Sequence, residues 1–184
     1  MTAAPPDRTA DPALGLGLEH GVNRLAPHNP LWATGFEAEA ARLRAGLSAA
    51  GLGHLVLGLE HCGSSAVPGL MAKPILDLQI GVADIAHAAA LIPAMQALGY
   101  DDAGDQGIPQ HRIFGLAQPR RVLAHVAIFD SAAWRETLRF RDRLRADAEV
   151  RAAYQALKLD LARTTANRAE YTAAKTAFVR RHSR

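Results

Sequence analysis

The sequence predicts an α+β fold, in which a mixed β-sheet is packed with helices and is followed by a helical C-terminal region. Three observations carry this prediction. Helical and strand patterns alternate over residues 29–99, two strand patterns joined by a short turn follow over residues 111–129, and almost everything after Ser131 is helical. Strands that first alternate with helices and then form a hairpin favour a mixed sheet over a doubly wound parallel sheet.

One domain and a tail are expected. The 184 residues can form one core that buries most of the apolar surface, but they are too few for two independent cores. We place this domain at residues 27–184. Residues 1–26 are expected to form a flexible tail, because their first part is rich in Ala, Pro and Gly and lacks the basic start and apolar core of a signal peptide.

Composition excludes several classes of protein. The longest nearly uncharged stretch, residues 51–67, contains Glu60 and several glycines, so it cannot form the apolar helix of roughly 20 residues that spans a membrane. We therefore expect a cytoplasmic protein with no membrane partner. Cys62 is the one cysteine of the chain, which excludes an intrachain disulfide and a thiolate metal cluster.

The first helix is predicted to begin after Asn29, which can cap free amides, with Pro30 in its first turn, and to end at Gly51. Its apolar residues recur at steps of three and four and form one face: Trp32, Phe36, Ala40, Leu43 and Leu47. Two short apolar runs, residues 54–60 and residues 75–82, predict strands. The helix is therefore expected to pack on a sheet.

A second helix is expected from Asp84 to Leu98, and Pro93 should kink or divide it. After a polar loop, residues 111–116 and residues 122–129 have strand patterns on either side of a short turn. The short connection makes these two strands an antiparallel hairpin.

The last third of the chain is predicted to contain three helices. Ser131 begins the first, and Asp147 caps the second, which runs through Leu161. Asn167, with Glu170 three residues later, resembles a capping box at the start of the third.

The residues that can support chemistry concentrate between the two predicted strands. In Gly63-Ser64-Ser65, backbone amides and hydroxyls can turn toward one point and accept phosphate oxygens, although such a sequence commonly forms only a turn. Farther on, Asp77 and Gln79 share one face of a strand, because side chains two residues apart point the same way. A carboxylate there could hold Mg²⁺ or Mn²⁺ against a polyphosphate.

The segment from His61 to Val82 resembles the signature of the GrpB-like family, which has the nucleotidyltransferase fold. In that signature His-x-Gly-Ser-Thr/Ser-x-Val-Pro-Gly-Leu-x-Ala-Lys-Pro precedes a strand that bears an Asp. The resemblance covers about residues 27–182. Further matching positions lie along the whole domain: Trp32, Phe36, Leu98-Gly99-Tyr100, Arg112-Ile113-Phe114, His125, Phe140-Arg141-Asp142, Leu144-Arg145, Tyr154, Lys158, Tyr171 and Lys175.

The resemblance implies a site in which the Gly-Ser turn, two acids on one strand and a third acid on a neighbouring strand bind a metal ion and a nucleoside triphosphate. Here Asp77 is the first acid, Gln79 holds the second position, and the third falls at or beside His125. Two of the three carboxylates are therefore replaced, which weakens metal binding. Asp77 and His125 could still hold a softer divalent ion, since imidazole is a competent ligand.

Three further residues are candidates with two interpretations each. His61 could shuttle a proton or donate to an oxyanion, or it could hydrogen-bond neighbouring backbone. Lys73 could neutralise a phosphate or be a solvated loop lysine. Arg112 could clamp a phosphate, or pair with Asp101 or Asp102.

The helical region adds two candidate anion contacts. Arg141 and Lys158 could close over the groove, or they could be balanced on the surface by Asp142 and Asp160. Lys175 is expected at the surface.

Two hypotheses of different classes follow. In the first, the protein binds a nucleoside triphosphate with a divalent metal ion and transfers a nucleotidyl group to a small-molecule acceptor, with His61 or His125 handling the proton. In the second, it is a non-catalytic nucleotide-binding or chaperone-like module, connected with coenzyme-A metabolism because relatives of the family occur fused to a dephospho-coenzyme-A kinase. A net charge of +3 without a nucleic-acid reading motif does not favour a nucleic-acid partner.

Overall fold

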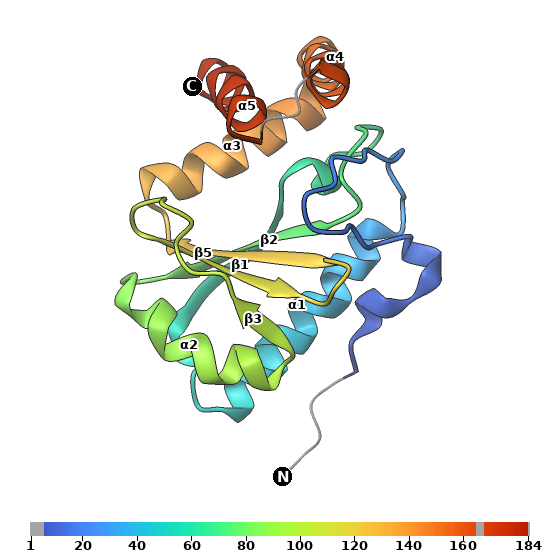
Figure 1. The fold of residues 1–184 in the computed structure, drawn as a ribbon. Coiled ribbons are helices and arrows are strands. Elements are labelled where there is room, and N and C mark those ends of the chain that lie inside the picture. The colour runs from blue at the N-terminus through green and yellow to red at the C-terminus, as the bar shows by residue number, and fades with distance from the viewer. Residues whose placement is uncertain (1–5, 165–167, 184) are drawn as a thin grey trace.

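A five-stranded mixed sheet lies at the centre of the fold (Figure 1). The computed structural model describes residues 6–164 and 168–183, and for residues 168–174 it describes the backbone alone. The sheet order is β1-β2-β5-β4-β3, with β2 and β5 parallel and the other neighbours antiparallel. The predicted α+β class with a mixed sheet is therefore confirmed. The strands are β1 (Val56–Cys62), β2 (Leu76–Val82), β3 (Tyr100–Asp102), β4 (His111–Leu116) and β5 (Val122–Ile128).

Helices lie on both sides of this sheet. α1 (Trp32–Ala49) and α2 (Ala86–Ala97) cover one face, and their apolar side chains share a core with the strands. α3 (Ala132–Ala146), α4 (Ala148–Thr164) and α5 (Arg168–His182) lie beyond the other face (Figure 1). The predicted helical C-terminal region is thus present, and it stands apart from the helices that close the main core.

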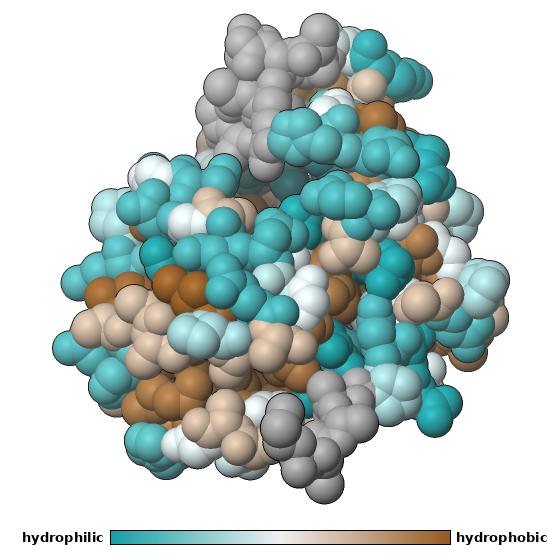
Figure 2. Space-filling view, turned by 60° about the horizontal axis from the view of Figure 1, so that its bottom comes forward, coloured by the Kyte–Doolittle hydropathy of each residue, from teal (hydrophilic) through white to brown (hydrophobic). Residues whose placement is uncertain are grey.

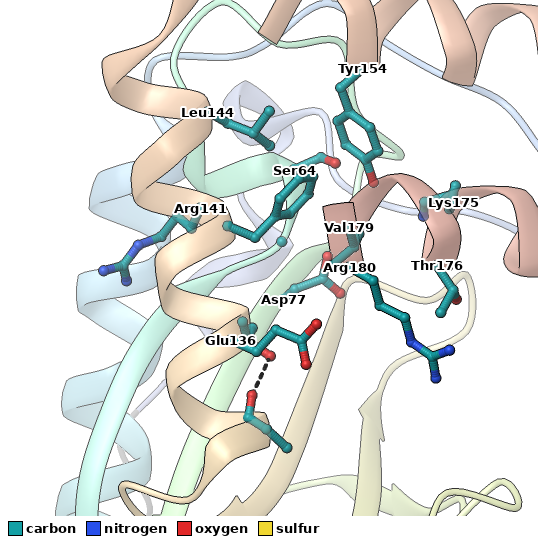
Figure 3. A pocket seen from close by; sticks show the side chains of 14 residues that line it. Ser64, Asp77, Glu136, Arg141, Leu144, Tyr154, Lys175, Thr176, Val179 and Arg180 are labelled. Atoms are coloured by element: carbon teal, nitrogen blue, oxygen red, sulfur yellow. Dashed lines mark hydrogen bonds between the residues drawn. The ribbon is translucent and has the colours of Figure 1, made fainter. Parts of the chain in front are cut away.

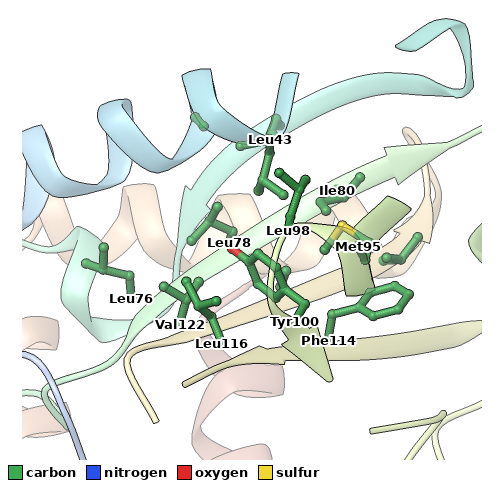
Figure 4. Close-up of a cluster of buried hydrophobic side chains, with 14 of the residues drawn as sticks. Leu43, Leu76, Leu78, Ile80, Met95, Leu98, Tyr100, Phe114, Leu116 and Val122 are labelled. Atoms are coloured by element: carbon green, nitrogen blue, oxygen red, sulfur yellow. The ribbon is translucent and has the colours of Figure 1, made fainter. Parts of the chain in front are cut away.

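Alternation along β2 places the main core on one face of the sheet (Figure 4). Leu76, Leu78, Ile80 and Val82 have no exposed surface, and they pack with side chains of α1 and α2. Full burial of one such side chain stabilises the fold by about 1.5–3 kcal/mol. Because side chains alternate along a strand, the residues between them, such as Asp77, point to the opposite face.

A second, smaller core holds the C-terminal helices against the loop that follows β1. Val67 and Leu70 of this loop have no exposed surface, and they pack with Phe140, Leu144 and Tyr154. The ring of Phe140 meets the ring of Tyr154 edge-on, with centroids 5.0 Å apart. The smaller core as a whole ties α3 and α4 to the end of the sheet at which β1 finishes and β2 begins.

The helix caps expected in the C-terminal region are largely present. The hydroxyl of Ser131 accepts the amide of Trp134 at 3.2 Å. Asp147 accepts the amides of Glu149 and Val150, both at 3.0 Å. The cap expected at Asn167 with Glu170 lies outside the described residues.

Three elements differ from expectation. The first strand begins at Val56, because residues 53–55 form a 3-10 turn before it. Pro93 does not divide α2, which is continuous from Ala86 to Ala97. β3 was expected to be part of a polar loop, since a strand of three residues at the edge of a sheet has too little alternation to be recognised.

The segment expected to be a flexible tail is packed against the domain over its described residues, 6–26. The carboxylate of Asp7 lies 2.6 Å from the guanidinium of Arg121, and Leu14 and Leu18 are buried. Ala26 forms a β-bridge with residue 72. Apolar leucines among the small residues of this segment explain the packing, because their burial offsets the entropy lost on ordering.

The surface shown in Figure 2 is mainly hydrophilic, and its hydrophobic residues gather in separate patches. Large exposed apolar side chains come from separate segments, as is ordinary for a folded domain: Val22, Leu31, Leu57, Ile108 and Phe129. No helix among the described residues combines the length and the apolar character that a membrane span needs.

Candidate functional site

A cavity of about 460 Å³ lies between the end of the sheet and the C-terminal helices (Figure 3). Its floor is formed by Gly63, Ser64 and Asp77, and its walls come from α3, α4 and α5. A volume of this size is typical of sites for small molecules and cofactors. The cavity therefore contains the turn and the carboxylate that the sequence predicted to work together.

Close contact with Asp77 explains the glycine of the turn. Gly63 has a φ of 66°, and a Cβ atom at this position would lie 2.3 Å from Oδ2 of Asp77. Both the backbone conformation and the space therefore favour glycine. The side chain of Asp77 is 30% exposed, so its carboxylate lies against the turn while part of it faces the cavity.

Two histidines extend from Asp77 across the same face of the sheet. Nε2 of His125 lies 3.7 Å from Oδ1 of Asp77, and Nδ1 of His125 lies 3.1 Å from Nε2 of His111. Burial, followed by the neighbouring His125, lowers the pKa of His111 to about 4, so this imidazole is neutral at pH 7. His111 was missed in the sequence, although its position in the strand puts it on the face of His125.

Gln79 lies on the predicted face but is more enclosed than Asp77. It is buried, and its Oε1 atom has no hydrogen-bond partner among the described residues. The described part of the chain contains no group of three or more His, Cys, Asp or Glu side chains arranged to hold a metal ion. A metal ion at Asp77 would therefore need ligand oxygens from water or from a bound phosphate.

Lys158 supports the turn from behind and does not line the cavity. It is 1% exposed, and its ammonium group donates to the hydroxyl of Ser64 at 3.2 Å and to the carbonyl of Met71. Burial and the nearby Lys175 lower the pKa of Lys158 to about 7, against an opposing effect of Asp77. Any action of this lysine on a ligand in the cavity would pass through Ser64.

His61 and Ser65 lie behind the turn as well. His61 is on the core side of β1, where its ring stacks on Phe36 with centroids 4.7 Å apart. Its Nε2 atom lies 3.1 Å from Oγ of Ser65, which in turn accepts the amide of Asp77 at 3.4 Å. Burial lowers the pKa of His61 to about 4. His61 thus helps to hold the turn, and neither it nor Ser65 lines the cavity.

Lys73 and Arg112 are not brought to the cavity. The ammonium group of Lys73 donates to Oδ1 of Asn23 at 2.8 Å, in the N-terminal segment. Arg112 alternates with Ile113 and so shares the core side of β4 with Phe114. Its guanidinium lies 3.5 Å from Asp102, which agrees with the second of its two interpretations.

Arg141 lines the cavity only with its aliphatic part. Its guanidinium points away (Figure 3) and lies 2.8 Å from carboxylate oxygens of Glu60 and of Asp142. It also donates to the carbonyl oxygen of His61 at 2.9 Å. Arg141 therefore joins α3 to the open edge of β1, and its charge is already neutralised within the protein.

The helical wall was largely missed in the sequence. α3 contributes a stripe at helical spacing, which includes Glu136 and Phe140. α5 contributes Lys175, Val179 and Arg180, so the expectation that Lys175 lies at the open surface is wrong. The spacing of the α3 residues was visible in the sequence, but the direction in which α5 faces depends on how it packs. The side chain of Tyr171 lies outside the described residues.

Comparisons with known proteins identify the family of the chain. The family model described as GrpB protein matches residues 23–184. A UPF0157 protein of Deinococcus radiodurans is 36% identical over 164 residues, which are 88% of this chain and 80% of that protein. A dephospho-CoA kinase of Mycolicibacterium paratuberculosis is 32% identical over 161 residues, 73% of this chain but 38% of the kinase.

The structural comparison points the same way. The crystal structure of the conserved protein GrpB from Enterococcus faecalis has a TM-score of 0.70 and 26% identity to this chain, and it covers 88% of this chain and 100% of its own. The resemblance read from the Gly63–Asp77 segment is therefore confirmed. On both the family match and the relatives, the chain belongs to the GrpB family.

Proposed function

We propose that the cavity binds a nucleoside triphosphate together with a divalent metal ion, and that the protein is a nucleotidyltransferase-like enzyme acting on a small-molecule acceptor. One observation carries this proposal. Asp77 lies against the Gly63-Ser64 turn on the floor of a cavity of about 460 Å³, so a carboxylate and a potential phosphate cradle open into the same space.

Two cationic side chains of the cavity suit such a ligand. Lys175 and Arg180 of α5 stand on the wall opposite the turn and can neutralise phosphate oxygens, while Ser64 can donate its hydroxyl. The residues Phe140, Leu144 and Tyr154 provide an apolar wall against which a base or an acceptor can pack. Phosphate recognition is thus assigned to the turn and α5, and not to Lys73, Arg112 or the guanidinium of Arg141.

The residues at the site can hold a metal ion only if the bound nucleotide completes the coordination shell of the ion. Asp77 offers one carboxylate and His125 a neighbouring imidazole, and Gln79 keeps an unpaired buried oxygen on the same strand face. Mg²⁺ and Mn²⁺ commonly keep waters and phosphate oxygens as ligands, so one carboxylate can anchor them when a polyphosphate is bound. A bound ion would supply neutralisation of phosphate charge, and His125 would accept or release the proton of the acceptor.

Calorimetry with the intact protein tests this proposal. ATP with Mg²⁺ or Mn²⁺ should bind, and Asp77→Asn should weaken the binding in the presence of metal by at least about tenfold, because the one carboxylate at the cation is lost. The matched control is Asp84→Asn, which neutralises an exposed aspartate at the start of α2. Equal affinities of the protein and the Asp77→Asn variant would remove Asp77 from the site.

The second candidate is a non-catalytic nucleotide-binding or chaperone-like module. Replacement of carboxylates at positions 79 and 125 favours it, since positioning a metal ion is central to phosphoryl-type transfer. The relative named dephospho-CoA kinase favours a connection with coenzyme-A metabolism. Nucleotide binding without turnover of any tested acceptor would support the module, and release of pyrophosphate that depends on Asp77 would contradict it.

A further inference from the structure

Ser64 is in contact with Lys158, a buried lysine that nucleotide binding does not require. Ser64 lines the cavity, and its Oγ atom lies 3.2 Å from Nζ of a lysine that is 1% exposed. A phosphate ligand would be held better by a lysine that reaches the cavity than by one sealed behind a serine. A buried amine in contact with an accessible hydroxyl is instead the arrangement of a nucleophile and its base.

We propose that Ser64 and Lys158 are a serine–lysine dyad that hydrolyses an activated ester through an acyl-Ser64 intermediate. This activity goes beyond the proposed nucleotide binding and does not depend on it.

Hydrogen bonding at Lys158 is compatible with a neutral amine. Neutral Nζ keeps two N–H groups and one lone pair, so it can still donate to the carbonyl of Met71 while its lone pair accepts the hydroxyl hydrogen of Ser64. The amide of Met71 donates to Oε1 of Gln155 at 3.0 Å, which holds Met71 close to the helix that carries Lys158. The base would therefore be held in place in both of its protonation states.

The surroundings of Lys158 favour the neutral amine near pH 7. Burial has the largest effect on its pKa, and Lys175 of α5 lowers the pKa further, while Asp77 of β2 raises it. The ring of Tyr154, one turn earlier in α4, has its centroid 5.1 Å from Nζ, a contact that favours the charged amine and so opposes the effect of burial. With a pKa of about 7, a large fraction of Lys158 would be free to accept a proton at pH 7–8.

The cavity can hold an acyl group beside Ser64. Leu144 and Tyr154 lie next to Ser64 in Figure 3, and all three line the cavity together with Phe140 and Val179. These side chains form an apolar part of the cavity, which Asp77, Glu136, Lys175 and Arg180 line as well. A short or medium apolar acyl chain is therefore the class of substrate that fits.

The reaction balances without a further reagent other than water. Oγ of Ser64 bonds to the ester carbonyl carbon as its proton passes to Nζ of Lys158, and the bond to the leaving alcohol breaks as a water molecule in the cavity protonates the departing oxygen. The hydroxide formed from that water attacks the acyl-Ser64 ester, and Lys158 returns its proton to Oγ of Ser64 as the acid departs. The products are the alcohol and the carboxylic acid, and no atom is oxidised or reduced.

Labelling of the full chain with a fluorophosphonate probe tests the dyad, with adducts located by mass spectrometry. One adduct at Ser64 is expected, and its rate should rise with pH through about 7 as Lys158 loses its proton. Ser64→Ala should abolish the adduct. Lys158→Arg retains a cation and donors for Ser64 and Met71 but cannot accept the proton, so labelling should fall by about 100-fold or more. Thr34→Ala, at an exposed hydroxyl of α1, should change nothing.

A thiol variant keeps the test decisive if Lys158→Arg folds poorly. The thiol introduced by Ser64→Cys should react with iodoacetamide faster when Lys158 is present than in the double variant that also carries Lys158→Met. The reason is that the amine of Lys158 takes the thiol proton. Cys62 is 3% exposed and should stay unmodified in all variants, which makes it an internal control. The dyad is overturned by an adduct elsewhere, by no adduct, or by equal rates with and without Lys158. Calorimetry with ATP is independent of these results, so either proposal can fail alone.

Discussion

The two faces of the sheet differ in how completely they are covered, and the difference separates stability from function. On the face of α1 and α2, β2 contributes Leu76 and Leu78, which have no exposed surface. On the other face the same strand contributes Asp77 and Gln79, and the C-terminal helices leave a cavity above the first of them. One strand thus supplies the core and the candidate site, and a shift of a single residue in its register would exchange them.

The largest effect is expected from a truncation on the covered face. Leu78→Ala should lower the free energy of unfolding by about 2–5 kcal/mol, since it leaves a cavity among fully buried side chains. Gln79→Met on the other face should change stability by at most about 1 kcal/mol, or raise it, because Oε1 of Gln79 is buried without a partner. Urea unfolding measures both, and equal losses would show that the two faces are packed alike.

Acid should destabilise the covered face through His61. Its pKa is lowered from 6.5 to about 4 by burial, so the folded state favours the neutral ring. Stability from this group is fully present above pH 6.5 and is lost as the pH falls toward 4, by about 3 kcal/mol in total. His61→Gln should flatten the dependence of the unfolding free energy on pH between 7 and 4. An unchanged slope would mean that His61 has the same pKa in the folded and the unfolded chain.

In the turn on the open face, Gly63 should be the residue least tolerant of substitution. Gly63→Ala places a methyl group on Asp77 and strains a positive φ, and we expect a loss of about 1–3 kcal/mol together with loss of nucleotide binding. The matched control is Gly69→Ala, which also has a positive φ but has no atom within 4 Å of the added Cβ. It should cost about 1 kcal/mol and leave binding intact. Thermal unfolding measures the stability of both variants, and calorimetry measures their nucleotide binding. Similar effects of the two substitutions on binding would contradict a special role for Gly63.

Some of these features were readable in the sequence. The common face of Asp77 and Gln79 follows from alternation alone, and the Gly63-Ser64 turn was recognised by its residues. The position of Arg112 was also readable, since it has the parity of Phe114 and Leu116, whose apolar side chains mark the core side. This parity favours the second of its two interpretations, the pairing with Asp102, over a place at the cavity.

Other features depended on packing between distant segments. Lys158 and Lys175 both depart from the roles expected of them, since the first is buried behind the turn and the second lines the cavity. Arg141 reaches the cavity wall, yet its charge goes to Glu60 and Asp142. The rotation of a helix about its own axis is decided by its contacts, and a single sequence with many scattered charges does not specify them.

Local chemistry in the sequence determined the mixed sheet, the glycine turn and the side of the strand on which Asp77 stands, because alternation and turn preference act over a few residues. The cavity was decided by tertiary structure. It exists because Val67 and Leu70 anchor α3 and α4 beyond the end of the sheet, and this contact joins segments 70 or more residues apart in the chain. Such long-range packing sets which side chains face the open space and which are sealed behind it.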